Sequence, residues 1–286
     1  MKGIILAGGS GTRLYPITKG ISKQLIPVWD CPMIYYPLAT LLRSGVSQLL
    51  IISTPSDIHG FQKLLGDGRK LGACIEYAVQ EEPKGIAQAL YIAESFLDGD
   101  SCILILGDNI FHGKYFIQCI KEAILKASNI ASIFTINVEN PNRFGVIKYD
   151  NNGIPIDIEE KPKKFISNDA VTGIYVYPNE AVSIAKKLSP SHRGEFEITD
   201  VNRVFLKYSK LEIVKLNHRD HWFDSGTLDS IKEAEKFVSL LEFKDGFKLG
   251  CIEQAALEGG LISKEEIMNV MPQDISSSYM NYLKQL

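Results

Sequence analysis

Residues 3–13 read GIILAGGSGTR, a short apolar run that leads directly into a glycine-rich loop. A run of this length before glycines is typical of a buried β-strand, and the exposed backbone N–H groups of such a loop make a cradle for an anion. With Arg13 beside the loop and Lys23 shortly after it, the stretch predicts a triphosphate site. Leu14 and Thr12 stand where a dinucleotide fingerprint and a nucleophile elbow need glycine, and the Gly-Lys-Ser/Thr of a Walker loop is missing. A strand-to-helix turn without a ligand is the alternative.

Strand-like and helical patterns alternate in the sequence around this loop. Apolar runs occupy residues 3–7, 49–53, 75–79 and 102–106, and helical patterns occupy residues 33–44, 86–96 and 115–127. Runs that are apolar at every position, such as 49–52, are typical of strands in a sheet that helices cover on both faces. Right-handed crossovers then predict an α/β fold with a doubly wound, mostly parallel sheet. Ligands in such folds bind beyond the carboxyl ends of the strands.

The sequence changes character after residue 129. From residue 130 to 177, strand-like runs are separated by turn signals such as Pro141-Asn142, which predicts mixed or antiparallel strands that extend the same sheet and hold a second ligand. Helical patterns return at residues 179–188, 199–208 and 227–241. We therefore expect a core of residues 1–242, divided into an N-terminal half of residues 1–129 and a second half of residues 130–242, and a C-terminal helical segment of residues 243–286.

Composition and charge exclude several classes of protein. The 286 residues, 45% of them hydrophobic, are enough to bury a substantial core. The net charge of -3 and the scattered basic residues indicate no interaction with nucleic acid or an anionic membrane, so the expected partners are small molecules. Five cysteines without a C-x-x-C pattern are typical of the reducing cytoplasm. The N-terminal apolar run is too short for a signal peptide, and no run approaches the roughly 18 residues of a membrane span.

Two aspartates follow apolar stretches that lie far apart in the sequence. Asp108 follows the run at 102–106, where it faces the ligand crevice, and Asp224 lies in WFDSGT at residues 222–227. Mg²⁺ usually takes one or two carboxylates plus substrate phosphates, so the pair predicts a magnesium site. Each aspartate alone is also typical of an Asx-turn or a helix N-cap, and Asp224 could cap the helix that begins near Thr227.

A third polar stretch reads IEEKP at residues 158–162. In this stretch, an acid that can accept hydrogen bonds from sugar hydroxyls adjoins a base that can meet a phosphate. A solvated charge run before a turn is the alternative. His218 and His221 are three residues apart, but no cluster of Cys or carboxylates completes a zinc set, so we expect them at the surface.

Longer stretches carry a family resemblance. Residues 6–19, LAGGSGTRLYPITK, and residues 22–28, SKQLIPV, resemble the signature of the sugar-nucleotide pyrophosphorylases. Within that superfamily, Ser-Lys-Gln-Leu and the PMIYYP of residues 32–37 are similar to the glucose-1-phosphate thymidylyltransferases. Adenylyl- and cytidylyltransferases usually have Lys-Pro there, and bacterial uridylyltransferases have Lys-Glu. The RGEFEITDVN of residues 193–202 also matches, so the resemblance covers nearly the whole chain.

The resemblance implies a Rossmann-like nucleotide-diphospho-sugar transferase fold, with the nucleotide on residues 1–129 and the sugar phosphate on residues 130–242. It implies transfer of a thymidylyl group from dTTP to α-D-glucose 1-phosphate, which gives dTDP-glucose and pyrophosphate. This reaction is the first step of dTDP-deoxysugar biosynthesis, such as that of dTDP-L-rhamnose. The resemblance also implies Mg²⁺ as cofactor, a cytoplasmic location and a homotetramer with contacts through residues 243–286.

Individual residues receive roles from the resemblance as well. The nucleotide is expected at Gly8, Gly11, Thr12, Arg13, Lys23, Gln24, Gln80 and Gly85, with the two glutamines near the base. The sugar phosphate is expected at Asn109, Gly145, Glu160, Lys161, Val171 and Glu197. Mg²⁺ is expected at Asp108 and Asp224. The expected reaction is an in-line attack of the sugar phosphate on the α-phosphorus, helped by positioning and positive charge. Its catalytic residues are Arg13, Lys23, Asp108, Lys161 and Asp224.

The chain departs from the family pattern at a few places, and other functions compete with this one. Ser225 stands where threonine is usual, Phe144 where tyrosine is more common, and Glu81-Glu82 where the base segment usually contains serine. A uridylyl- or cytidylyltransferase of the same fold is the nearest alternative. A glycosyltransferase would show Asp-x-Asp, but residues 108–110 read DNI. A non-catalytic nucleotide-sugar sensor would tolerate loss of the charged residues, which are all present.

Overall fold

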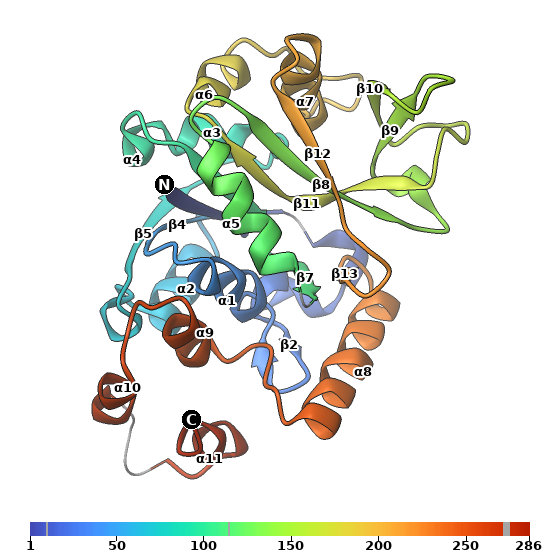
Figure 1. The fold of residues 1–286 in the computed structure, drawn as a ribbon. Helices are drawn as coiled ribbons and strands as arrows, with labels where there is room; N and C mark the ends of the chain where they lie inside the picture. The colour runs from blue at the N-terminus through green and yellow to red at the C-terminus, as the bar shows by residue number, and fades with distance from the viewer. Residues whose placement is uncertain (10, 114, 271–274) are drawn as a thin grey trace.

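A computed structural model describes residues 1–9, 11–113, 115–270 and 275–286 of the chain. Within these residues, the central sheet has nine strands (Figure 1). Its parallel half consists of β6 (Cys102–Leu106), β1 (Lys2–Leu6), β4 (Gln48–Ser53) and β5 (Cys74–Val79), in that spatial order. The predicted doubly wound, mostly parallel core is therefore confirmed.

Alternate residues of the parallel strands enter hydrophobic clusters on opposite faces of the sheet. In β4, Leu49 and Ile51 join one cluster, whereas Leu50 and Ile52 join another. Helices α1 (Tyr35–Arg43), α2 (Ile58–Leu65) and α5 (Phe116–Lys126) contribute to the first cluster. Helices α3 (Gln88–Ile92), α4 (Glu94–Leu97), α6 (Glu180–Ala185) and α7 (Ile198–Lys207) contribute to the second. Burial on both faces explains why the inner strands β1, β4 and β6 carry long apolar runs, whereas the edge strand β5 also contains Glu76 and is partly exposed.

The second half of the chain adds antiparallel strands to the same sheet, as predicted. Strand β11 (Asp169–Tyr177) runs antiparallel to β6 and also pairs with β8 (Ala131–Asn137) and β9 (Gly145–Tyr149). Strand β10 (Pro155–Glu160) follows β9 at the edge, and β12 (Leu211–Lys215) runs parallel to β8. In Figure 1, β9 and β10 lie at the end of the sheet away from β5.

A separate ribbon joins the two halves of the chain. Strand β7 (Asn109–His112) directly follows β6 and pairs antiparallel with β13 (His221–Asp224). In this pairing Asp224, the last residue of β13, lies opposite Asn109, the first residue of β7. The pairing thus brings together two segments that are distant in the sequence. A small hairpin of β2 (Pro27–Val28) and β3 (Cys31–Pro32) lies near the following helix α8 (Leu228–Asp245).

The predicted helices are present, with one difference. The helix predicted at residues 86–96 is divided into α3 and α4, which meet at Ala93. The first part begins at Gln88, and the Ala87 N–H just before it donates to the Phe196 carbonyl. Helix α8 is capped by Thr227, whose side chain accepts from the Ser230 N–H, so the alternative interpretation of Asp224 as this cap is wrong.

The C-terminal segment packs on the same molecule. Helix α9 (Ile252–Glu258) lies against α1, and Gly259 allows this approach because a Cβ there would lie 1.9 Å from the Leu42 carbonyl oxygen. Helix α10 (Lys264–Val270) precedes α11 (Ser278–Leu283), whose Met280 and Leu283 are buried in the first cluster. Within the described residues, no helix has both the length and the apolar character needed to cross a bilayer.

Candidate active site

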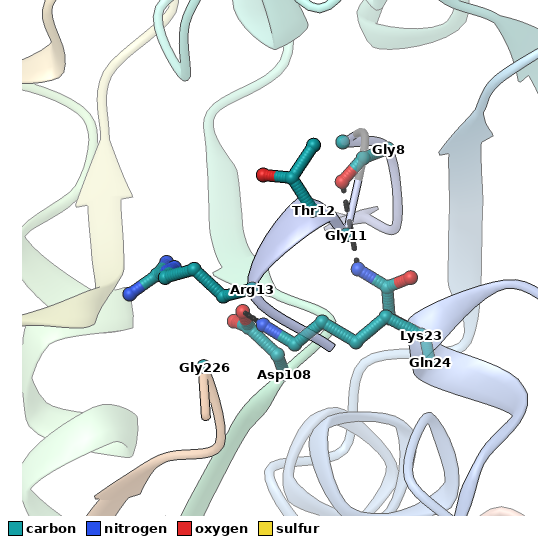
Figure 2. A pocket seen from close by; sticks show the side chains of 9 residues that line it. Gly8, Gly11, Thr12, Arg13, Lys23, Gln24, Asp108 and Gly226 are labelled. Carbon is teal, nitrogen blue, oxygen red and sulfur yellow. Dashed lines mark hydrogen bonds and ion pairs between the residues drawn. The ribbon is translucent and has the colours of Figure 1, made fainter. Parts of the chain in front are cut away.

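A cavity of about 240 Å³ lies beyond the carboxyl ends of β1 and β6. Its walls come from the glycine-rich loop, the turn after it, the end of β6 and the turn after β13 (Figure 2). The lining residues are Gly8, Gly9, Gly11, Thr12, Arg13, Lys23, Gln24, Asp108 and Gly226. The structure thus brings together most of the predicted nucleotide residues with one of the predicted metal ligands. Ser10 of the loop lies outside the described residues.

The loop has the backbone conformation that its glycines permit. Gly11 has a φ of 56°, in the left-handed region that glycine adopts without strain. Its carbonyl accepts a hydrogen bond of 2.8 Å from the Thr18 hydroxyl, which holds the loop against the next turn. Arg13 crosses to the turn after β13, where a Cβ on Gly226 would lie 3.1 Å from the guanidinium. Gly226 therefore leaves the room that the Arg13 side chain occupies, although the sequence alone does not single it out.

Asp108 and Asp224 lie on neighbouring segments beside this loop. The Ser225 N–H donates to the Asp108 carbonyl at 3.0 Å, next to the pairing of Asp224 with Asn109. Lys23 donates to the Asp108 carboxylate (Figure 2), and Arg143 donates to that of Asp224 at 3.2 Å. Burial opposes the ionisation of Asp108, but the charge and hydrogen bond of Lys23 hold its pKa below the usual value. Burial and the nearby charge of Asp108 raise the pKa of Asp224.

Asn109 connects the Asp108 carboxylate to the sheet and to the ribbon. Its Nδ2 donates to Asp108 Oδ1 at 2.8 Å, and its Oδ1 accepts from the Gly173 N–H at 3.1 Å and from Trp222 Nε1 at 2.5 Å. The side chain is buried and is held on both of its polar atoms. Asn109 therefore orients the carboxylate. Trp222, to which the sequence assigns no role, takes part through its indole N–H.

Of the residues predicted for the sugar phosphate, Gly145, Glu160 and Val171 lie together on β9, β10 and β11, whereas Asn109 lies on β7 and Glu197 just before α7. Gly145 pairs with Glu160, and a Cβ on Gly145 would lie 3.4 Å from Glu160 Oε2 and 3.7 Å from the Cβ of Val171. Thr199 donates to Glu160 Oε2 at 2.6 Å. Lys161, exposed at the end of β10, has a φ of 46°.

A basic residue balances the acids on this side. Arg193 lies 3.6 Å from Glu160, 2.8 Å from Glu195 and 3.1 Å from Glu197. Burial and then the charge of Glu197 raise the pKa of Glu160, whereas Arg193 opposes this rise. Glu160 and Glu197 also line a hollow of about 260 Å³. The predicted Glu197 thus shares its surroundings with Glu160.

The residues predicted near the base lie on the other side of the loop. Gln24 Nε2 lies 3.5 Å from the Gly8 carbonyl oxygen, and the Gln80 side chain reaches the same glycine from the end of β5. Gly85 has a φ of 113°, and a Cβ there would lie 2.4 Å from the Phe196 carbonyl oxygen. This close approach fastens the segment after Gln80 to the sugar-phosphate side, because the Phe196 N–H also donates to the Lys84 carbonyl at 2.7 Å.

Comparison with known proteins identifies the family. Residues 2–239 match a family model described as nucleotidyl transferase. The chain is 46% identical to the glucose-1-phosphate thymidylyltransferase of Neisseria meningitidis over 286 residues, which covers 100% of this chain and 99% of the relative. The chain belongs to the glucose-1-phosphate thymidylyltransferase family. The Mycobacterium tuberculosis glucose-1-phosphate thymidylyltransferase is also 46% identical, with coverage of 100% of this chain and 99% of the relative.

Solved structures agree with membership of the glucose-1-phosphate thymidylyltransferase family. One of these structures is that of a Bacillus anthracis protein assigned as a glucose-1-phosphate thymidylyltransferase, in complex with sucrose. Its sequence is 41% identical to this chain, and the TM-score is 0.76. The alignment covers 83% of this chain and 94% of that one. A UDP-glucose pyrophosphorylase bound to UDP-glucose has a TM-score of 0.73 at 23% identity, with coverage of 84% of this chain and 98% of that one, which shows the shared fold. The chain is therefore an enzyme of the nucleotidyltransferase class.

The donor set of this glucose-1-phosphate thymidylyltransferase family member suits Mg²⁺. Asp108 and Asp224 are close enough for the charge of one to raise the pKa of the other, so a cation between them would relieve their repulsion. Within the described residues, no group of three or more His, Cys, Asp or Glu side chains forms a metal cage. Mg²⁺ commonly binds to such a pair and completes its coordination with substrate phosphates and water.

Proposed function

We propose that the enzyme transfers a thymidylyl group from dTTP to α-D-glucose 1-phosphate and releases pyrophosphate. One observation carries this proposal: Arg13 of the glycine-rich loop and Lys23 just after it line one cavity together with Asp108, at the carboxyl ends of the parallel strands. This cavity has cations for a triphosphate and a carboxylate for its metal, as nucleotidyl transfer requires. The names of relatives that align with the whole chain support the choice of dTTP and glucose 1-phosphate.

The reaction needs no nucleophile from the protein. A phosphate oxygen of glucose 1-phosphate attacks the α-phosphorus of dTTP in line, a new P–O bond forms, and the bond to pyrophosphate breaks. The two substrates repel each other, and Arg13, Lys23 and Lys161 offset this repulsion with positive charge. Mg²⁺, held by Asp108 and Asp224, would add positive charge at the phosphates.

The remaining predicted residues hold the two substrates in position. Glu160 accepts hydrogen bonds from sugar hydroxyls, and its bond from Thr199 fixes the direction of the carboxylate. Gly145 and Val171 line the place beside it without bulky side chains. Such positioning lowers the barrier, because two substrates held in attacking geometry lose less entropy in the transition state.

Pyrophosphate release tests this function directly. Purified enzyme receives Mg²⁺, glucose 1-phosphate and one of dTTP, UTP, CTP, ATP or GTP. We expect dTTP to give the highest kcat/KM, Asp108→Asn to lose activity, and EDTA to stop the reaction until Mg²⁺ is restored. Preference for UTP or CTP would instead indicate a relative with another base preference. Binding without turnover on every triphosphate would indicate a nucleotide-sugar sensor.

We also propose a homotetramer in the cytoplasm that supplies dTDP-deoxysugar biosynthesis. All five cysteines lie among the described residues and are free thiols, which suits that compartment. In the C-terminal segment, Phe243 is 88% exposed and Met268 53% exposed, which supports subunit contacts there. Phe243→Ser should lower the mass in light scattering. Deleting residues 259–286 would be a poorer test, because it also removes Met280 and Leu283 from the core.

A further inference from the structure

The Gln88 side chain fixes the orientation of the Gln80 amide, which lies next to Gly8 of the loop. We propose that Gln88 is a positioning residue that makes the base site selective for pyrimidines with an N3–H proton, thymine and uracil, over cytosine. The inference rests on the proposed function, because it takes Gln80 as the side chain that meets the base.

A backbone donor determines which way Gln88 points. The Lys84 N–H donates to Gln88 Oε1 at 3.0 Å, and Gln80 Nε2 donates to the same oxygen at 2.7 Å. A backbone N–H cannot accept a hydrogen bond, so the Gln88 atom facing it must be the oxygen. The second group that meets this oxygen must then be the NH₂ of Gln80 rather than its carbonyl.

Because Gln80 Nε2 faces Gln88, the opposite side of the amide, its oxygen, is turned towards the loop. A Cβ on Gly8 would lie 2.4 Å from Gln80 Oε1, so this oxygen lies over a glycine that lines the cavity. The Gln80 N–H is bonded to the Ser53 carbonyl at 2.8 Å, which holds the backbone at the end of β5. Among the residues that the structure describes, no recorded hydrogen bond is donated to Gln80 Oε1.

The chemistry of the bases turns this acceptor into a filter. Thymine and uracil carry a donor at N3, which can pair with Gln80 Oε1. Cytosine carries an acceptor at N3, so two acceptors would face each other and remain unpaired. A buried mismatch of this kind typically reduces kcat/KM about 10- to 100-fold. The filter does not distinguish dTTP from UTP, because their N3 positions are alike.

The comparison of UTP with CTP tests the filter, and the comparison of dTTP with UTP is its internal control. Gln88→Met keeps the length of the side chain and removes the acceptor, so the Gln80 amide can rotate. We expect the UTP/CTP ratio of kcat/KM to fall about tenfold while the dTTP/UTP ratio stays unchanged. Gln88→Glu keeps the acceptor for Lys84 and Gln80, so it should keep the wild-type UTP/CTP ratio.

Calorimetric affinities for UTP and CTP give the same comparison without catalysis. The inference would be overturned if Gln88→Met kept the wild-type UTP/CTP ratio, or if the ratio fell equally in Gln88→Glu. Turnover of dTTP by the wild type would leave the proposed function intact in either case. Failure of the wild type to turn over dTTP would overturn the proposed function, and the binding ratios would still decide the role of Gln88. If Gln88→Met does not fold by circular dichroism, Gln88→Asn withdraws the acceptor by one methylene and replaces it in both measurements.

Discussion

Replacing Arg193 with methionine should weaken glucose 1-phosphate binding. The substitution retains an extended side chain but removes the positive charge 3.6 Å from Glu160. Opposite charges about 4 Å apart attract by about 1 kcal/mol in water and about 4 kcal/mol at an effective dielectric constant of about 20. The side chains of Arg193 and Glu160 are 26% and 22% exposed, so solvent screening favours the lower end of this range. A loss of about 1–2 kcal/mol corresponds to an increase in KM of about 5- to 30-fold.

The effect should also depend on pH, because the proposed acceptor of the sugar hydroxyls is the ionised form of Glu160. Burial and the charge of Glu197 raise its pKa above the ordinary value of 4.5. Glu160 is therefore fully ionised at high pH, and the ionised form is lost as the pH falls through this raised pKa. Without Arg193 the pKa should rise further, so the increase in KM should be larger at about pH 6 than at about pH 8.

Steady-state kinetics with each substrate varied in turn measure the change. Arg69→Met is the matched control, because Arg69 pairs with Asp67, is 88% exposed and lines neither the cavity at the loop nor the hollow beside Glu160. The control should leave both KM values at the wild-type level. An unchanged KM for glucose 1-phosphate at both pH values in Arg193→Met, or an equal increase in the KM for dTTP, would refute the reasoning.

Two further predictions concern buried contacts. The Lys248 side chain is only 1% exposed, and its ammonium group pairs with Asp30 and Glu242. Lys248→Met leaves these two carboxylates without their cation, so it should lower the free energy of unfolding by about 3 kcal/mol and Tm by about 6–9 °C. A calorimetric decrease under about 1 kcal/mol would contradict this expectation. Gly8→Ala places a methyl group 2.4 Å from Gln80 Oε1, which must withdraw, so the KM for dTTP should rise about tenfold while that for glucose 1-phosphate stays constant. Equal changes in the two KM values would argue against a local effect on the base side.

The predictable features of the fold are those that depend on local sequence. The apolar runs that form β1, β4 and β6 indicate buried strands, and the glycines after β1 indicate the turn, whereas the run in β5 lies at the sheet edge and is partly exposed. The division of the helix at Ala93 is not predictable in this way. Nor is the hydrogen bond of Ala87 to Phe196 just before α3, because it is a contact between segments that lie far apart in the sequence.

The candidate site shows the same limit. Asp108 is recognisable because it follows an apolar strand, and Asp224 because it ends a short apolar stretch; their proximity then depends on the pairing of β7 with β13. The resemblance assigns Asn109 to the sugar phosphate, and that role stays a prediction. Its bonds to Asp108, Gly173 and Trp222 come from three separate segments, so no local pattern could reveal them. Gly226 and Gln88 escape sequence analysis for the same reason.

The pairing of β7 with β13 has a consequence for how the protein is made. During translation, the glycine-rich loop and Asp108 leave the ribosome long before Asp224. The strands of the parallel half can associate early, since β1, β4, β5 and β6 are all synthesised before residue 107. A nascent chain that stops before residue 221 therefore contains one carboxylate of the pair without the other. The proposed metal site can therefore form only after synthesis has passed residue 224.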